Sequence, residues 1–189
     1  AQESGLQLLS GNLGRAMVKT SAVDPAYWQV RAPARVFDSE AAVHQAYAAG
    51  LLQGDLVLVV RFQGPRANGM PELHKLMPLL VNLQRNGQKV ALLTDGRLSG
   101  ASGKVLAALH LTPEAAAGGV LARVHEGDWI SLDALSGRME LEVSEAELAT
   151  RRPATATEEL AAGFGLSRFG ARRRRVGPAD QGATTLEWE

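Results

Sequence analysis

Two short apolar runs, each followed by a polar stretch that contains glycine, form the clearest pattern in the chain. Residues 56–60 read Leu-Val-Leu-Val-Val and residues 90–93 read Val-Ala-Leu-Leu. Runs of this length, rich in branched aliphatic residues, are typical of buried strands. The polar stretches 61–73 and 94–104 therefore lie at strand ends, where α/β proteins often carry their chemistry.

Other parts of the chain alternate between helical and strand-like patterns. Apolar spacing and capping residues predict helices over residues 40–49, from near Pro71 to Asn86 with a kink at Pro78, over 104–109, from Thr112, and over 144–149 and 157–162. Short apolar runs between turns predict one or two strands within 6–23, and further strands over 89–94, 120–125, 128–132 and 139–143. The fold class is therefore mixed α/β, with a β-rich barrel or sandwich and helices packed on it.

Composition limits the classes of protein to which the chain can belong. Its 189 residues, of which 46% are hydrophobic, suffice for one domain with a core. Apolar runs stay well below the roughly 18 residues of a membrane helix, and the polar start at residues 1–5 does not resemble a signal peptide. We expect a cytoplasmic protein that does not bind membranes.

Charges are balanced overall but unevenly distributed. The formal net charge is zero, which argues against nucleic-acid binding, and the four arginines at 172–175 are interpreted as a solvated or interdomain face. Residues 125–150 contain seven acidic residues and one arginine, whereas residues 151–175 contain seven arginines and two glutamates. A polar contact between these segments, or with another domain, is expected.

The stretch 94–104, Thr-Asp-Gly-Arg-Leu-Ser-Gly-Ala-Ser-Gly-Lys, contains the richest set of functional groups. Its glycines allow tight turns and close approach of backbone N–H groups to a ligand. Ser99 and Ser102 supply hydroxyl groups, and Arg97 and Lys104 supply positive charge. Such a loop suits an anionic substrate, although most loops of this composition only connect elements.

Two spaced motifs resemble a known family. Residues 61–73, Arg-Phe-Gln-Gly-Pro-Arg-Ala-Asn-Gly-Met-Pro-Glu-Leu, and residues 94–100, Thr-Asp-Gly-Arg-Leu-Ser-Gly, are similar in content and order to the C-terminal part of the dihydroxy-acid and 6-phosphogluconate dehydratases. Further matches run from residues 11–14 to residues 127–128, so the resemblance covers nearly the whole chain. The amino-acid sequences of residues 63–73 and 11–23 resemble the 6-phosphogluconate branch more than the dihydroxy-acid branch.

The resemblance implies a fold and a reaction. The fold is a swivelling β/β/α domain, similar to the mobile domain of aconitase-like enzymes. The implied activity is that of a hydro-lyase that converts 6-phospho-D-gluconate to 2-dehydro-3-deoxy-6-phosphogluconate in the Entner–Doudoroff pathway. Two alternatives remain: another sugar-acid or dihydroxy-acid dehydratase, and a non-catalytic binding module of the same fold.

The resemblance also implies cofactors and partners. Family members use an iron–sulfur cluster, expected to be 4Fe–4S, which cysteine thiolates hold. This chain contains no cysteine. We therefore expect residues 1–189 to be the C-terminal domain of a larger dehydratase whose N-terminal domain carries the cluster, with Mg²⁺ as a second cofactor and a homodimer as the assembly.

The site residues follow from matching the family motifs. Ser99 is the expected base that removes the substrate proton, and Glu72 is the expected Mg²⁺ ligand. The expected substrate-binding residues are Arg66, Arg97, Gly100, Ser102 and Lys104. Each has a simpler alternative: a turn-forming serine, a glutamate at the start of a helix after Pro71, or a solvated surface charge.

Overall fold

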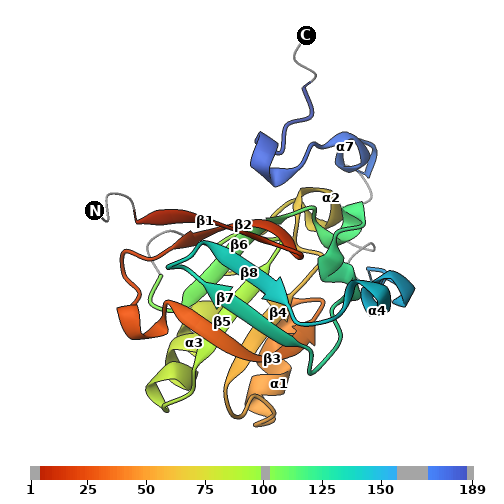
Figure 1. Ribbon diagram of the computed structural model, residues 1–189. Helices are drawn as coiled ribbons and strands as arrows, with labels where there is room; N and C mark the ends of the chain where they lie inside the picture. The colour runs from red at the N-terminus through yellow and green to blue at the C-terminus, as the bar shows by residue number, and fades with distance from the viewer. Residues whose placement is uncertain (1–4, 99–102, 157–169, 187–189) are drawn as a thin grey trace.

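The structure is a computed structural model that describes residues 5–98, 103–156 and 170–186 (Figure 1). Within these residues, eight strands close into a barrel in the order β1-β2-β6-β5-β4-β3-β7-β8. The strands are β1 (Leu6–Gly11), β2 (Gly14–Lys19), β3 (Gln29–Phe37), β4 (Leu56–Val60), β5 (Val90–Thr94), β6 (Leu106–Thr112), β7 (Trp129–Asp133) and β8 (Arg138–Leu141). The predicted mixed α/β class with a β-rich barrel is confirmed.

Helices and short 3-10 turns cover parts of the barrel. They are η1 (Pro25–Tyr27), α1 (Glu40–Ala48), α2 (Pro65–Asn68), α3 (Leu76–Arg85), η3 (Ala115–Ala117), η4 (Val120–Arg123), α4 (Glu145–Thr150), α7 (Gly170–Arg175) and η5 (Ala179–Gln181). Ser39, one of the two capping residues that the sequence allowed beside Asp38, caps α1 by accepting a hydrogen bond from Ala42 N. In the described part of the chain, no helix is both long and apolar enough to cross a membrane.

The barrel consists of a parallel half and an antiparallel half. Strands β3, β4, β5 and β6 pair in parallel, whereas β1–β2, β2–β6, β3–β7 and β7–β8 pair antiparallel. One parallel bridge, between Ser10 of β1 and Arg138 of β8, closes the barrel within the antiparallel half. Val57 and Val59 of β4 point into the barrel, whereas Leu56, Leu58 and Val60 pack against the helices α1 and α3. Burial of both faces explains why this strand is apolar throughout.

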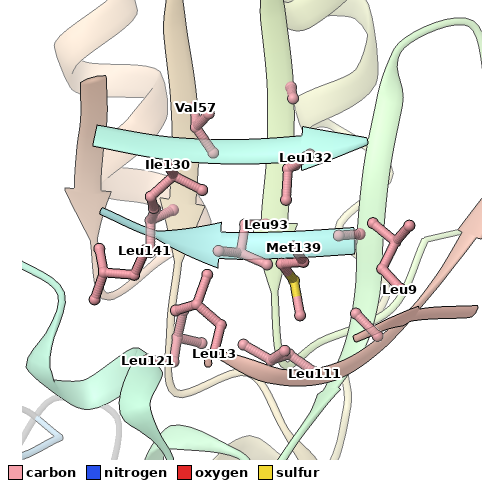
Figure 2. Packing of buried hydrophobic residues seen from close by; sticks show 14 of the residues in the cluster. Leu9, Leu13, Val57, Leu93, Leu111, Leu121, Ile130, Leu132, Met139 and Leu141 are labelled. Atoms are coloured by element: carbon pink, nitrogen blue, oxygen red, sulfur yellow. The ribbon is translucent and has the colours of Figure 1, made fainter. Parts of the chain in front are cut away.

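A hydrophobic cluster fills the inside of the barrel. Leu9, Leu93, Ile130 and Met139 come from four different strands and meet there, as Figure 2 shows. All four side chains are fully buried. The interior is therefore a packed core, and polar chemistry is confined to the strand ends and the outer surface.

Two helix predictions in the second half of the chain are wrong in type or start. Residues 104–109 were expected to be helical, but Leu106–Thr112 is the strand β6, because it pairs in parallel with β5 inside the closed sheet. The helix expected from Thr112 is only the 3-10 turn η3, and it follows a cis Thr112–Pro113 peptide bond. Alanine-rich sequence favours helix locally, and strand pairing overrides that preference here.

Three further elements also differ from expectation. The predicted strand at 120–125 is the 3-10 turn η4, and the strand β3 was not predicted. The helix expected from Pro71 begins at Leu76, so Pro78 lies in its first turn, where a missing N–H breaks no helical hydrogen bond. Pro78 therefore helps to start α3 and does not interrupt it. The helix expected at 157–162 lies outside the described residues.

A polar contact joins the acidic and basic segments, as their charges predict. Arg151 donates to Asp128 at 2.5 and 2.9 Å and to Glu147 at 2.6 Å. The hydrogen bond to Asp128 raises the pKa of Arg151 above its ordinary value. This cluster fixes the chain after α4 against the start of β7.

Candidate functional site

Parallel strands bring three loops to one edge of the barrel. Because β4, β5 and β6 run in the same direction, the segments that follow Val60, Thr94 and Thr112 all begin at the carboxyl ends of these strands. The two family motifs lie in the first two of these segments. The edge therefore has the position at which α/β folds commonly bind ligands.

Asp95 joins the three loops through its buried carboxylate. Its oxygens accept hydrogen bonds from Phe62 N at 3.2 Å, Gln63 N at 2.8 Å and Ala115 N at 3.0 Å. The Asp95 side chain is fully buried, and burial raises its pKa to about 6, although the three N–H groups act in the opposite direction. The sequence showed this residue only as part of the Thr-Asp-Gly motif, and its role depends on contacts distant in sequence.

The loop after β4 adopts a backbone conformation that needs this support. Phe62 has a φ of 63°, which is uncommon for a residue with a side chain. The neighbouring Gln63 is buried and lies so close to Gly96 that a Cβ at position 96 would be 2.7 Å from the Gln63 Cβ. Glycine at position 96 is thus required for the close approach of the two motif loops.

A second buried carboxylate, Glu114, fixes the loop that contains α2. Glu114 accepts from Arg66 N at 2.8 Å and from Ala67 N at 3.1 Å. A Cβ at Gly64 would lie 2.4 Å from Glu114 Oε2, so a side chain there would displace the carboxylate that holds Arg66 N and Ala67 N. Asp95 and Glu114 together attach the loops after β4 and β5 to the residues that follow β6.

The structure brings Glu72 and Arg97 together. Arg97 Nη1 lies 3.4 Å from Glu72 Oε2, and Arg97 Nε donates to Met70 O at 2.7 Å. The two residues also form a parallel backbone bridge, with Leu73 N donating to Arg97 O at 3.1 Å. Since Glu72 lies in this bridge and α3 begins only at Leu76, the alternative of a glutamate at a helix start is wrong.

In the described structure, no hydrogen bond or ion pair joins Arg66 or Lys104 to the Glu72–Arg97 pair. Arg66 lies on α2. Lys104 is exposed near the start of β6, and its carbonyl oxygen is 3.4 Å from Gln84 Nε2 on α3. Ser99, Gly100 and Ser102 lie outside the described residues, so their predicted roles stay predictions.

His110 is a neighbour of the motif loops that the sequence did not single out. Its N–H donates to Gly96 O at 3.0 Å, and its φ is 56°. Burial, and then the positive charge of Arg97, lower the pKa of His110 below its ordinary value. A neutral imidazole beside Arg97 is therefore expected at neutral pH.

The described residues fit the two expected cofactors differently. With no cysteine, the chain does not fit an iron–sulfur cluster. Across residues 5–98, 103–156 and 170–186, no three histidine or carboxylate groups gather as metal ligands. Glu72 fits Mg²⁺ as a single oxygen ligand, since its side chain is 30% exposed at the loop edge, but Arg97 neutralises its charge.

Comparison with known proteins agrees with the family resemblance of the two motifs. Residues 1–183 match the family model described as "Dihydroxy-acid/6-phosphogluconate dehydratase C-terminal". The chain belongs to this family. The membership confirms the resemblance seen in the sequence.

Curated relatives come from both branches of the family. The chain is 52% identical to the phosphogluconate dehydratase of Rhizobium meliloti over 183 residues, which are 96% of the chain and 30% of that protein. It is 51% identical to the phosphogluconate dehydratase of Pseudomonas aeruginosa over 184 residues, 97% of the chain and 30% of that protein. The dihydroxy-acid dehydratase of Moorella thermoacetica is 43% identical over 155 residues, 80% of the chain and 28% of that protein. The chain thus spans about 30% of the length of these phosphogluconate dehydratases.

Proposed function

We propose that the chain is the C-terminal domain of a hydro-lyase that dehydrates 6-phospho-D-gluconate to 2-dehydro-3-deoxy-6-phosphogluconate in the Entner–Doudoroff pathway. The observation that supports this most directly is the identity of 52% and 51% with the phosphogluconate dehydratases of Rhizobium meliloti and Pseudomonas aeruginosa, over 96% and 97% of the chain. The dihydroxy-acid dehydratase of Moorella thermoacetica is 43% identical over 80% of the chain. The meeting of Glu72 and Arg97 at the carboxyl edge of the barrel supports a polar site there.

In the proposed reaction, Ser99 Oγ removes the proton from C2 of the sugar acid. The C3–O bond breaks, and the C2 proton and the C3 hydroxyl leave in net as one water molecule. The resulting enol gains a proton at C3, loses the proton of its C2 hydroxyl group, and so becomes the 2-keto product. A serine needs nearby positive charge to act as a base, and Arg97, two residues from Ser99, is a cation in the same loop.

The buried carboxylates hold the loops in which these groups lie. Asp95 precedes Gly96 and Arg97, so its three hydrogen bonds fix the start of the loop that leads to Ser99. Glu72 would hold Mg²⁺ together with ligands from outside this chain, and the ion would supply positive charge to the substrate's oxygens. Arg66, Gly100, Ser102 and Lys104 remain proposed substrate-binding residues.

The whole enzyme is proposed to contain an N-terminal domain that carries the iron–sulfur cluster, and to act as a cytoplasmic homodimer. Turnover of 6-phosphogluconate and of 2,3-dihydroxy-isovalerate by the full-length protein tests the substrate assignment. We expect the phosphorylated substrate to have the higher kcat/KM. A preference for the dihydroxy acid would place the protein in the other branch, and no turnover of either would favour a binding module.

A further inference from the structure

The C-terminal segment packs against the loop that contains α2. Arg173 Nε donates to Arg66 O at 3.1 Å, and the Arg173 guanidinium also donates to Ala67 O. Figure 1 shows α7 beside α2, on the outside of the barrel. Two distant parts of the sequence therefore meet here, and a cavity of about 270 Å³ lies between them.

Two arginines and a threonine line this cavity together with apolar residues, among them Pro65 and Val176. Arg172, Arg173 and Thr185 come from the C-terminal segment, and Gly69 and Met70 come from the loop after α2. None of the lining residues is acidic, and within the described residues no carboxylate pairs with Arg172. A concave surface with unpaired arginine charge suits an anion that accepts several hydrogen bonds.

A neighbouring cavity provides a contrast. This second cavity, of about 290 Å³, is lined by Arg15 and Arg66 but also by Glu114 and Asp180, and Arg15 is paired with Asp180. Its positive charge is therefore compensated within the chain. Among the residues that the structure describes, no carboxylate compensates the charge of Arg172, so the cavity at Arg172 is the better anion site.

The cavity shares a wall with the candidate site. Met70 lines it, and the Met70 carbonyl accepts the 2.7 Å hydrogen bond from Arg97 Nε, while Arg97 also pairs with Glu72. An anionic group in the cavity would therefore lie at one side of the Glu72–Arg97 pair. In a phosphorylated sugar acid, the phosphate and the reacting C2 and C3 atoms lie at opposite ends of the same chain.

We propose that this cavity binds the phosphate group of the sugar-acid substrate, with the Arg172 guanidinium and the Thr185 hydroxyl as its donors. Arg173 is a positioning residue, because it attaches α7 to the carbonyl groups of α2. The assignment of a sugar-acid phosphate as ligand rests on the proposed function. The existence of the cavity does not depend on that function, because it follows from the contacts between α7 and α2.

The first experiment compares Arg172→Ala with Arg174→Ala in the full-length enzyme. Both changes remove one positive charge from α7, but Arg174 does not line the cavity. The measurement is the ratio of kcat/KM for 6-phosphogluconate to kcat/KM for unphosphorylated gluconate. Loss of a charge-assisted hydrogen bond is expected to lower this ratio about 10- to 100-fold in Arg172→Ala, mainly through KM.

The substrate ratios of the three variants Arg172→Ala, Arg172→Lys and Arg174→Ala are compared. A ratio that stays near the wild-type value in Arg174→Ala and recovers in part in Arg172→Lys supports the cavity, because lysine keeps the charge but loses the bidentate geometry. An unchanged ratio in Arg172→Ala, or an equal fall in both alanine variants, would overturn the proposal.

A second experiment separates this proposal from the proposed function. Inorganic phosphate is titrated into the 189-residue chain and into its two alanine variants, with NMR shifts of backbone amides as the readout. Shifts at Gly69, Met70 and Thr185 that disappear in Arg172→Ala and persist in Arg174→Ala support the cavity even if 6-phosphogluconate is not a substrate. Shifts that are absent in the wild-type chain, or that persist in Arg172→Ala, would overturn it.

Discussion

Buried carboxylates in the parallel half of the barrel bond to the backbone, whereas Glu140 and Glu142, on the outer face of the antiparallel half, pair with arginine side chains. Asp95 and Glu114, at the ends of β5 and β6, accept only from backbone N–H groups in the described structure. On β8 and after it, Glu140 pairs with Arg138 and Glu142 pairs with Arg31. The first arrangement determines the shape of three loops, whereas the second only balances charge at the surface.

This difference follows from the burial of the two halves. Both faces of β4 and β5 are buried, so polar groups at their ends have little access to water and need partners within the protein. The strands β7 and β8 bury one face and expose the other, where charged side chains remain solvated. We therefore expect changes at the parallel edge to alter function and stability strongly, and changes on the antiparallel face to have small effects.

The largest expected effect is on catalysis in the loop after β5. In the full-length enzyme, Ser99→Ala should lower kcat about 10² to 10⁴-fold with a much smaller change in KM, because it removes a positioned base. Ser131→Ala on β7 is the matched control and should retain nearly full activity. Exchange of the C2 hydrogen with deuterated solvent should stop in Ser99→Ala. Exchange at the wild-type rate would show that another group is the base.

The next effect concerns stability. Asp95→Ala leaves three buried N–H groups without their partner, and we expect it to lower the free energy of unfolding by about 3–5 kcal/mol. Denaturation of the 189-residue chain by urea measures this difference. Asp133→Ala is the control, because Asp133 accepts from Leu135 N and Ser136 N in an exposed turn. Equal losses in both variants would remove the distinction between the two halves.

The contributions of Asp95 in the parallel half and Asp128 in the antiparallel half to the free energy of unfolding should change with pH in opposite directions. Burial raises the pKa of Asp95 to about 6, so between about pH 4 and pH 6 the folded chain retains a proton that the unfolded chain has lost. The Asp95 contribution to stability is therefore present at low pH and falls by up to about 3 kcal/mol as the pH rises through 6. Asp95→Asn should lack this dependence when urea midpoints are compared between pH 4 and pH 7.

Asp128, at the start of the antiparallel half, provides the opposite case. Burial acts to raise its pKa, but hydrogen bonds from Arg151 and from His125 N outweigh burial and lower it. Its contribution is thus present above the unfolded pKa, near 4, and is lost as the pH falls through the lower folded pKa. Asp128→Asn should therefore flatten the acid limb of the stability curve. If it changed the slope near pH 6 instead, the assignment of the two signs would be wrong.

A smaller effect is expected at the proposed metal ligand. Glu72→Gln keeps the size of the side chain and removes its charge, so the full-length enzyme should need about tenfold or more Mg²⁺ for half-maximal activity. Glu142→Gln, which removes a carboxylate from the antiparallel half, is the control and should leave this requirement unchanged. An unchanged requirement in Glu72→Gln would leave Glu72 as the partner of Arg97 alone.

Local sequence patterns predicted the elements whose structure depends on nearby residues. The strand β4 follows from five consecutive branched aliphatic residues, and α1 follows from its Ser39 cap and its stop at Gly50. The strand β6 was expected to be helical, because its alanines favour a helix and its strand state depends on pairing with β5. Pairing between distant segments is not visible in a local window of sequence.

The candidate site shows the same division. Family motifs identified Glu72 and Arg97 as site residues, and the structure places them 3.4 Å apart. Asp95 was not singled out, because its role requires the loops at Phe62, Gln63 and Ala115 to meet around it. A motif indicates which residues belong to the candidate site. The closed sheet determines which residues, such as Asp95, hold the site loops in place.

The smallest expected effect is on the exposed face of β8. Arg138 Nη2 lies 3.2 Å from Glu140 Oε1, and their side chains are 70% and 32% exposed. Solvent screens such pairs, so Arg138→Ala should change the free energy of unfolding by only about 0–1 kcal/mol. The change should shrink further when urea denaturation is repeated in 1 M salt. A double-mutant cycle with Glu140→Gln would isolate the pair from other effects of each change. A coupling above about 2 kcal/mol, or one that salt does not weaken, would mean that charges on the antiparallel face also support the fold, as the buried carboxylates of the parallel half do.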